Sequence, residues 1–294
     1  MAEDQGINGD IWNNRAITLL RFFNWKQIGD TNMDLTGTED DKYGVDGLMT
    51  CEDPSTDIPQ PVIIESKRYA PKSLSQSLVN GWIDRLKKKI NECRNSEYLF
   101  EKFPSLQTSG TLNQGLIMCW IKDADETIMK KMYSFFEQYN EKSGISNNWV
   151  KICFFTNDRI VTLCSILDEV KKEKLEFYYP SQIIGNRTST YSKVLTCNYM
   201  CSEIILARKI NKSNKKYVFY LGSMDSRGLK ILHSCLSMFQ YAVKGENLTI
   251  LYNHKDDEFR KIENDVKNEY EGVKVEFKPF GDYSIQTEPS IICQ

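Results

Sequence analysis

The chain has 294 residues, of which 40% are hydrophobic and 27% charged, so it can form one large globular domain or two smaller ones. Its formal net charge of −2 argues against a generally basic nucleic-acid-binding protein, so any contact with nucleic acid would depend on local patches. No apolar run approaches the roughly 20 residues of a membrane span, and residues 1–10 lack the layout of a signal peptide. We therefore expect a cytoplasmic protein that has no membrane segment.

The nine cysteines are scattered along the sequence, and no two of them have Cys-x-x-Cys spacing. The sequence contains only two histidines, His233 and His254, which lie far apart and offer little for a zinc site. Several cysteines lie inside apolar runs. Buried, reduced thiols are therefore the favoured interpretation, rather than disulfides or structural zinc.

Periodicity predicts alternating helices and strands over the first 180 residues. Residues 10–25 carry apolar side chains three and four apart, which is typical of an amphipathic helix, with Asp10 as its N-cap. Residues 42–50 and 61–69 are expected to be strands, joined by a loop over residues 51–60. The elements expected after them are a helix at 73–93, a strand at 115–122, a helix at 123–142, a strand at 150–155, a helix at 158–173 and a strand at 175–179.

The alternation continues after a polar stretch, residues 181–193, which we interpret as a linker or surface loop. The tail from Gly281 is expected to be loose. The order predicts an α/β protein with a mixed sheet flanked by helices over residues 1–180 and a second, smaller α/β unit over residues 194–294. The elements expected in the second unit are a helix at 194–209, a strand at 217–221, a helix at 226–243, a strand at 248–252, a helix at 256–270 and a strand at 273–277.

Charged side chains interrupt two of the expected strands. Asp46 lies between small and apolar residues, and Glu65 and Lys67 end an apolar run that begins at Val62. Since side chains alternate along a strand, Glu65 and Lys67 should share one face. With Asp46 alongside, two carboxylates and one lysine could hold a hard divalent cation and activate a water molecule on it. A structural ion pair is the other interpretation of the same residues.

This order of a helix, a strand with Asp and a strand with Glu-x-Lys resembles the PD-(D/E)XK nuclease superfamily, which has the restriction-endonuclease-like fold. Asp46 matches the acidic position and Glu65–Ser66–Lys67 the second half-motif, and the resemblance covers roughly residues 9–122. It implies that Asp46 and Glu65 bind Mg²⁺, for which Mn²⁺ could substitute. It further implies that Lys67 assists the attacking water or stabilises the charge that develops on the phosphate.

The sequence also departs from the pattern of this superfamily. Members often place a Glu in the first helix, three residues before an alanine, and Asn13 occupies that position relative to Ala16. A metal would then be held by Asp46, Glu65 and the backbone carbonyl of Ser66. Gln76 matches a polar residue that members frequently carry near the metal in the following helix.

Basic residues that follow the motif could contact the phosphates of DNA, or could form an ordinary solvated helix face. They are Arg68, Lys72, Arg85, Lys87, Lys88 and Lys89. A second basic run near residue 210, which has the same two interpretations, comprises Arg208, Lys209, Lys212, Lys215 and Lys216.

We expect a magnesium-dependent endonuclease that hydrolyses DNA phosphodiester bonds. The layout resembles nuclease subunits of bacterial anti-phage defence systems, which implies a protein partner subunit. A homodimer would supply the two sites that a double-strand cut generally requires. The alternatives are a catalytically silent nuclease-fold scaffold that binds nucleic acid or protein, and a nuclease that acts on RNA or transposon ends.

Overall fold

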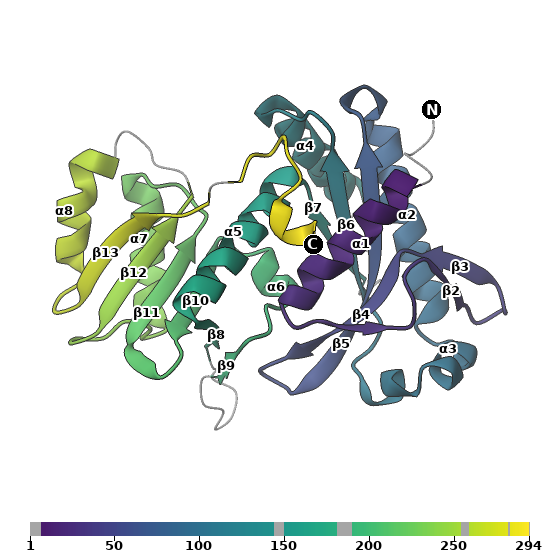
Figure 1. The fold of residues 1–294 in the computed structure, drawn as a ribbon, viewed down its shortest axis with the longest axis horizontal. Coiled ribbons are helices and arrows are strands. Elements are labelled where there is room, and N and C mark those ends of the chain that lie inside the picture. Colours follow the sequence, from purple (N-terminus) through teal and green to yellow (C-terminus); the bar gives the residue numbers. More distant parts are fainter. Residues whose placement is uncertain (1–6, 144–149, 181–189, 254–258, 282, 294) are drawn as a thin grey trace. The chain divides into compact units, whose positions relative to one another are not determined.

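The protein was studied as a computed structural model, which describes residues 7–143, 150–180, 190–253, 259–281 and 283–293. The chain divides into two compact units (Figure 1). The first comprises Met1–Asp53, Asp57–Cys164 and Tyr283–Gln294, and the second comprises Pro54–Thr56 and Ser165–Asp282. Most of the stretch expected to be a linker, residues 181–193, lies outside the described residues.

The first unit is built on a five-stranded mixed sheet in the order β1-β4-β5-β6-β7. β4 pairs with β1 and β5 in antiparallel fashion, whereas β5, β6 and β7 run parallel. This arrangement confirms the predicted α/β class with a mixed sheet. The strands are β1 (Lys26–Ile28), β4 (Gly47–Asp53), β5 (Ile58–Tyr69), β6 (Gln114–Ile121) and β7 (Lys151–Phe155), and a separate hairpin comprises β2 (Met33–Thr36) and β3 (Lys42–Val45).

Helices cover both faces of this sheet. A Cβ at Gly115 of β6 would lie 2.7 Å from Leu86, so this face packs closely against α2. The residues of β6 that alternate with Gly115 face α1 on the other side of the sheet. There the Trp12 indole N–H donates to the carbonyl of Met118 (3.1 Å). Figure 1 shows α1 crossing the sheet. The helices of this unit are α1 (Ile7–Phe22), α2 (Gln76–Cys93), α3 (Glu97–Lys102), α4 (Glu126–Ser143) and the start of α5 (Asn157–Glu173), with short 3₁₀ turns η1 (Pro71–Ser73) and η2 (Pro104–Thr108).

The expected loop over residues 51–60 is wrong, because β4 and β5 extend through it as a long hairpin. The prolines at positions 59 and 61 lie before Val62, where the ladder with β6 begins. Their missing N–H groups therefore break no hydrogen bond to β6. Prolines in a sequence favour a loop, and only the sheet neighbours decide whether a strand tolerates them.

The C-terminal tail is not loose, contrary to the expectation from sequence. Its 3₁₀ turn η3 (Ser290–Ile292) contacts α1, and Ile292 is only 2% exposed. The Asn157 side chain donates to the carbonyl of Ile285 (2.7 Å). Figure 1 shows this end of the chain beside α1. Burial of two consecutive isoleucines, which the polar residues around them obscure in the sequence, explains the ordered tail.

The second unit contains a six-stranded sheet in the order β13-β12-β11-β10-β8-β9. Leu229, Leu232 and Leu236 of α7 pack with Phe259 and Val266 of α8 in one core cluster, which also contains strand residues. The elements are β8 (Leu175–Tyr179), β9 (Thr190–Ser192), α6 (Cys197–Met200), β10 (Ile204–Lys209), β11 (Lys212–Tyr220), α7 (Ser226–Met238), β12 (Asn247–Tyr252), α8 (Phe259–Glu269) and β13 (Lys274–Pro279).

Two expectations for this region differ from the structure. The helix expected at 194–209 is wrong, since only α6 is helical and residues 204–209 form a strand paired with both β8 and β11. β8, expected within a first domain of residues 1–180, instead belongs to the six-stranded sheet of the second unit. The cause in both cases is strand pairing, which local periodicity does not reveal.

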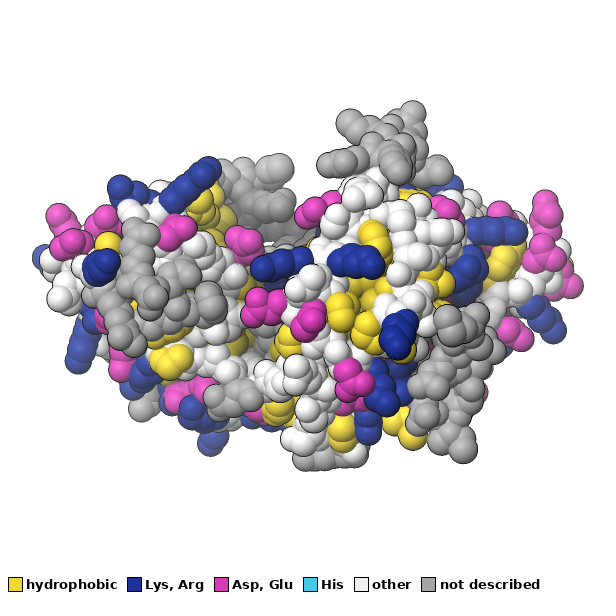
Figure 2. Space-filling model, turned by 90° about the horizontal axis from the view of Figure 1, so that it is seen from above, with side chains coloured by type: hydrophobic (Ala, Val, Ile, Leu, Met, Phe, Trp, Pro, Cys, Tyr) yellow, Lys and Arg dark blue, Asp and Glu magenta, His cyan; other side chains and the backbone are white. Residues whose placement is uncertain are grey.

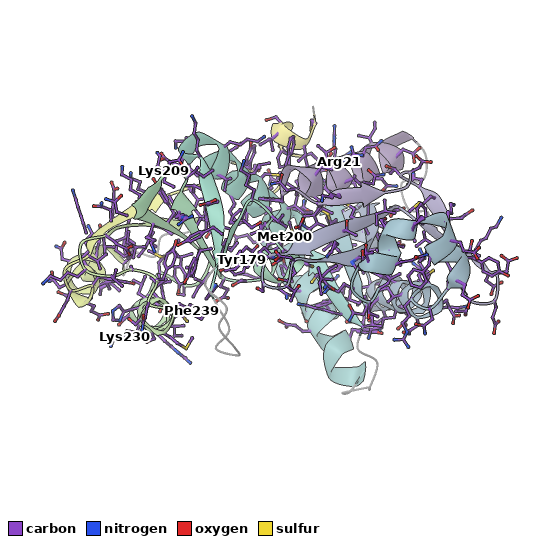
Figure 3. All side chains as sticks on the ribbon, turned by 90° about the horizontal axis from the view of Figure 1, so that it is seen from below. Arg21, Tyr179, Met200, Lys209, Lys230 and Phe239 are labelled. Atoms are coloured by element: carbon purple, nitrogen blue, oxygen red, sulfur yellow. The ribbon has the colours of Figure 1, made fainter. Side chains whose placement is uncertain are left out.

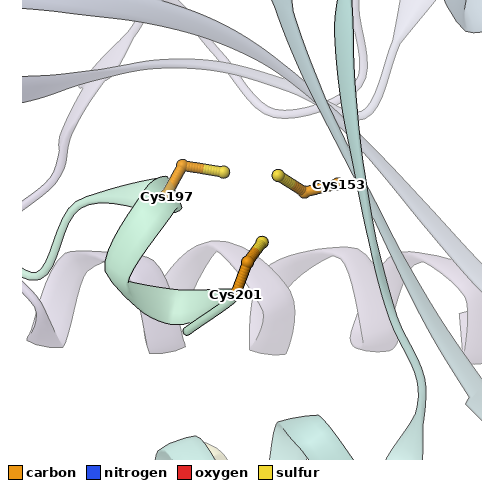
Figure 4. A group of neighbouring side chains, drawn as sticks. All are labelled: Cys153, Cys197 and Cys201. Carbon is orange, nitrogen blue, oxygen red and sulfur yellow. The ribbon is translucent and has the colours of Figure 1, made fainter. Parts of the chain in front are cut away.

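Six of the nine cysteines are buried. This burial agrees with the expectation that several cysteines lie in the core. Cys197 and Cys201 lie at the two ends of the short helix α6 (Figure 4). Burial raises the pKa of the Cys93 thiol to about 12, so this thiol stays protonated. Among the described residues, no helix is long and apolar enough to cross a membrane.

Candidate active site

A cavity of about 530 Å³ opens in the first unit, and its walls come from α1, the β2–β3 hairpin, β5 and α2. Asp46 lines this cavity and is the single residue between β3 and β4. Glu65, Ser66 and Lys67 of β5 complete the same wall. The structure therefore brings together the four residues that the sequence analysis singled out.

The two carboxylates converge on one ammonium group. Lys67 Nζ lies 3.0 Å from Glu65 Oε2 and 3.6 Å from Asp46 Oδ2. The strand alternation predicted from sequence explains the first contact, because Glu65 and Lys67 project from the same side of β5. Glu65 and Lys67 are 7% and 8% exposed, so the charges lie largely out of water and stabilise one another.

Asp46 is held by the backbone as well as by the lysine. The Ser66 N–H donates to Asp46 Oδ2 at 2.6 Å, which fixes this carboxylate beside β5. Burial, and secondarily the negative charge of Glu65, raise the pKa of Asp46 above its ordinary value of 3.8, although Lys67 acts in the opposite direction. Because a cation stabilises an ionised carboxylate, a site in which burial disfavours ionisation favours the binding of a cation.

Lys89 of α2 is a fourth charged member of the cluster. Its Nζ contacts Glu65 Oε1, whereas Lys67 Nζ lies 3.0 Å from Glu65 Oε2. Arg85, one helical turn earlier, also lines the cavity. Their i, i+4 spacing places both on one face of α2. From the sequence, Lys89 was grouped with the other basic residues of this helix. Only its position directly before the apolar Ile90, which is buried, distinguished it from them.

Asn13 lies beside Asp46, as the sequence comparison suggested. Its side-chain N–H group is 3.4 Å from Asp46 Oδ1 and donates to Asn32 Oδ1 at 2.7 Å. Asn32 in turn donates to Asp10 Oδ1 at 2.8 Å. Asn32 was not predicted from sequence. It adopts a left-handed backbone conformation (φ 56°) that Asn tolerates better than most residues, and this is the signal that could have marked it.

Two predicted residues near the start of α2 do not line the cavity. Gln76 turns toward α4, where its side-chain N–H group donates to the carbonyl of Phe135 at 2.7 Å. Lys72 is exposed in the 3₁₀ turn η1. Helix packing, which the sequence motif does not reveal, sets the direction of Gln76.

The basic residues of α2 separate into different directions. Lys87 Nζ lies 4.5 Å from the centre of the Tyr139 ring of α4, and Lys88 Nζ lies 5.9 Å from the ring centre of Tyr43. Neither lines the cavity, whereas Arg85 does. Arg68, which follows the Glu-Ser-Lys motif, also lines it and pairs with Glu288 of the C-terminal tail (3.1 Å).

The second basic run is largely neutralised by local ion pairs. Arg208 pairs with Glu176, and Lys209, labelled in Figure 3, pairs with Glu173 at 2.7 Å. On the face drawn in Figure 2, lysine and arginine side chains are interspersed with acidic ones. These pairs favour the interpretation of this run as an ordinary charged surface.

The donor set in the cavity fits a hard divalent cation. Asp46 and Glu65 supply carboxylate oxygens, the ligands that Mg²⁺ prefers, and both already converge on the positive charge of Lys67. With the Ser66 carbonyl beside them, the residues proposed from sequence as ligands lie in one wall of the cavity.

The family model described as the GAPS4 protein PD-(D/E)XK nuclease domain matches residues 1–159. The matched segment contains Asp46 and Glu65–Ser66–Lys67 together with every strand of the five-stranded sheet. Neither a curated protein nor a solved structure matches the chain.

Proposed function

The chain belongs to the family of the GAPS4 protein PD-(D/E)XK nuclease domain, a bacterial anti-phage defence nuclease family, and we propose that it is a magnesium-dependent endonuclease that hydrolyses DNA. The observation that carries this proposal is the convergence of the Asp46 and Glu65 carboxylates on Lys67 in an open cavity. A catalytically silent scaffold would gain nothing from keeping these costly buried charges together.

Asp46, Glu65 and the Ser66 carbonyl would hold Mg²⁺ or its substitute Mn²⁺. When bound, the metal would lower the pKa of a coordinated water and neutralise charge on the scissile phosphate. Lys67 donates hydrogen bonds only, because its ammonium has three donors and no acceptor. It would orient the attacking water and stabilise the negative charge that develops on the phosphate.

Arg68 and Arg85 are the residues that we propose as phosphate contacts, since both line the cavity that contains the carboxylates. A guanidinium matches the geometry of a phosphate with two parallel N–H groups. With a net charge of −2 for the whole chain, these local cations would supply the attraction that the molecule as a whole lacks.

The family assignment leads us to propose a defence effector that acts on DNA in the cytoplasm together with a protein partner subunit. Each chain would contribute one active site, and therefore a double-strand cut would require a homodimer or two successive events.

The test compares cleavage of plasmid DNA, single-stranded DNA and RNA in Mg²⁺ and in EDTA, with and without the product of a neighbouring gene. We expect plasmid cleavage that requires the metal and is lost in the Lys67→Met variant. Equal cleavage by wild type and Lys67→Met would assign the activity to a contaminant. Cleavage of RNA alone would favour the RNA-directed alternative, and DNA binding without any cleavage would favour the silent scaffold.

A further inference from the structure

A carboxylate from the C-terminal tail bridges two arginines, one of which lines the cavity. Glu288 Oε1 accepts from Arg68 Nε at 3.1 Å, and Glu288 Oε2 pairs with Arg15 of α1. The Glu288 side chain is 11% exposed, and those of Arg68 and Arg15 are 21% and 27% exposed. A single acid from the tail thus pairs with two half-buried guanidinium groups, one from α1 and one from β5.

Arg68 is the member of this group that belongs to the site. It follows Lys67 directly in β5 and lines the same cavity as Glu65. Strand alternation turns its side chain to the face opposite Lys67, which is the face that α1 covers. On this side both Arg68 and Arg15 pair with Glu288, and two guanidinium groups that share one acid would repel one another without it.

Anchoring of the tail does not by itself require this acid. The two consecutive isoleucines, at positions 291 and 292, are 8% and 2% exposed, and Asn157 holds the carbonyl of Ile285. Apolar burial and this hydrogen bond already hold the segment in place. The contact of Glu288 with Arg68 therefore has a consequence other than anchoring the tail. Glu288 sets the direction of the Arg68 guanidinium by occupying its Nε edge.

We propose that Glu288 is a positioning residue for the nuclease site, which holds Arg68 ready to contact a substrate phosphate. The family match ends at residue 159. The C-terminal segment Tyr283–Cys293 would then contribute to the site from outside the matched part of the chain. This inference rests on the proposed function, because it assigns to Arg68 the role of a phosphate contact.

The test measures KM and kcat for cleavage of a labelled duplex by the full-length protein. Glu288→Gln keeps the size of the side chain and removes the charge. We expect KM to rise about tenfold, the loss that one weakened phosphate contact produces, while kcat changes less than about twofold. Glu276→Gln, which removes an acid from an exposed ion pair in β13, is the matched control and should leave both constants unchanged.

A second variant separates positioning from a general loss of folding. In an Arg68→Ala background, Glu288→Gln should raise KM no further, because the residue on which it acts is absent. An additional rise in that background would overturn the proposal, as would an unchanged KM in the single variant. A lower KM would overturn it too, since the carboxylate would then compete with substrate phosphate for Arg68.

Failure of the proposed function has a different signature. If the wild-type protein neither binds nor cleaves DNA, the nuclease assignment falls and the role of Glu288 falls with it. If the wild type cleaves and Glu288→Gln matches it in every constant, only the role of Glu288 is refuted.

Discussion

Glu65 is the residue on which the electrostatics of the cavity depend. Lys67 contacts one of its oxygens and Lys89 the other, so two ammonium groups compensate one buried carboxylate. Breaking a buried ion pair leaves an uncompensated charge and is costly, whereas exchange of an ammonium for a metal ion keeps the charge balanced. In the proposed function, a divalent cation would therefore compete with Lys89 for Glu65.

This competition predicts that removing Lys89 improves metal binding. Lys89→Met eliminates a positive charge that repels the cation, and Mn²⁺ affinity should rise on the order of threefold to tenfold. Calorimetric titration of Mn²⁺ into the protein without DNA measures this directly. Lys88→Met, on the same helix but outside the cavity, is the matched control and should leave the affinity unchanged. Weaker Mn²⁺ binding by Lys89→Met would refute the competition.

Asp46 allows a prediction about stability and pH. Burial raises the pKa of Asp46 above its ordinary value of 3.8. At pH values above 3.8, ionisation of this carboxyl group therefore lowers the stability of the folded protein. Asp46→Asn should therefore raise the melting temperature of the metal-free protein at neutral pH. The cleavage rate should fall by more than the roughly 10–100-fold that is typical when a residue hydrogen-bonded to a metal ligand is lost.

The sign of this effect is checked by thermal melts in EDTA from neutral pH down to the ordinary carboxyl pKa of 3.8. The stability gained by Asp46→Asn should shrink as the pH falls, because the wild-type carboxyl then becomes protonated in the folded state. A gain that stays constant over this range would show that ionisation of Asp46 is not its cause.

Single residues differ in how far the sequence could identify them. The alternation of a strand was enough to place Glu65 and Lys67 on one face, and the flanking glycine and valine marked Asp46. The three successive lysines of α2 could not be told apart, because their directions depend on helix packing. Glu288 could not be found at all, since 220 positions separate it from Arg68.

At the level of elements, the site depends on how closely α2 packs on β6. A Cβ at Gly115 would lie 2.7 Å from Leu86 and 3.0 Å from Ile90. Only glycine lets the helix approach the sheet far enough for Lys89 to reach Glu65.

Gly115→Ala should therefore push α2 outward. We expect a loss of about 1–3 kcal/mol in the free energy of unfolding, as is typical for overpacking, together with slower cleavage. Denaturant melts and cleavage rates measure the two effects. Unchanged stability would mean that Leu86 and Ile90 yield without moving the helix.

The tail offers a second test of an element. Ile292→Ala should lower the free energy of unfolding by about 2–5 kcal/mol, because the side chain is buried against the first unit. Met238→Ala on α7, which truncates a side chain that is 70% exposed, is the control and should change stability by less than about 0.5 kcal/mol. Equal effects of the two substitutions would contradict an ordered tail.

Most elements were predictable because their apolar periodicity is strong and long. The helices at 73–93, 123–142 and 158–173 differ from α2, α4 and α5 only near their ends. The helix expected at 194–209 failed because residues 204–209 gain ladder hydrogen bonds from two neighbouring strands. Such non-local pairing overrides local propensity.

At the level of the whole molecule, the family match and the two compact units describe different parts of the chain. The match covers residues 1–159, whereas the first unit also includes the tail from Tyr283 onward. The second unit retains exposed apolar side chains on and after α7, where Figure 3 labels Phe239. We propose that these exposed apolar side chains contribute to a contact with the partner subunit.

The central claim is that Asp46 and Glu65 hold a catalytic metal ion. The most direct test is the single-turnover cleavage rate of a labelled DNA duplex as a function of Mg²⁺ concentration, for wild type and Glu65→Gln. We predict a rate that saturates with Mg²⁺ in the wild type and is lost in the variant, whose circular dichroism spectrum stays unchanged. A variant that cleaves at the wild-type rate with the same Mg²⁺ dependence would contradict the claim.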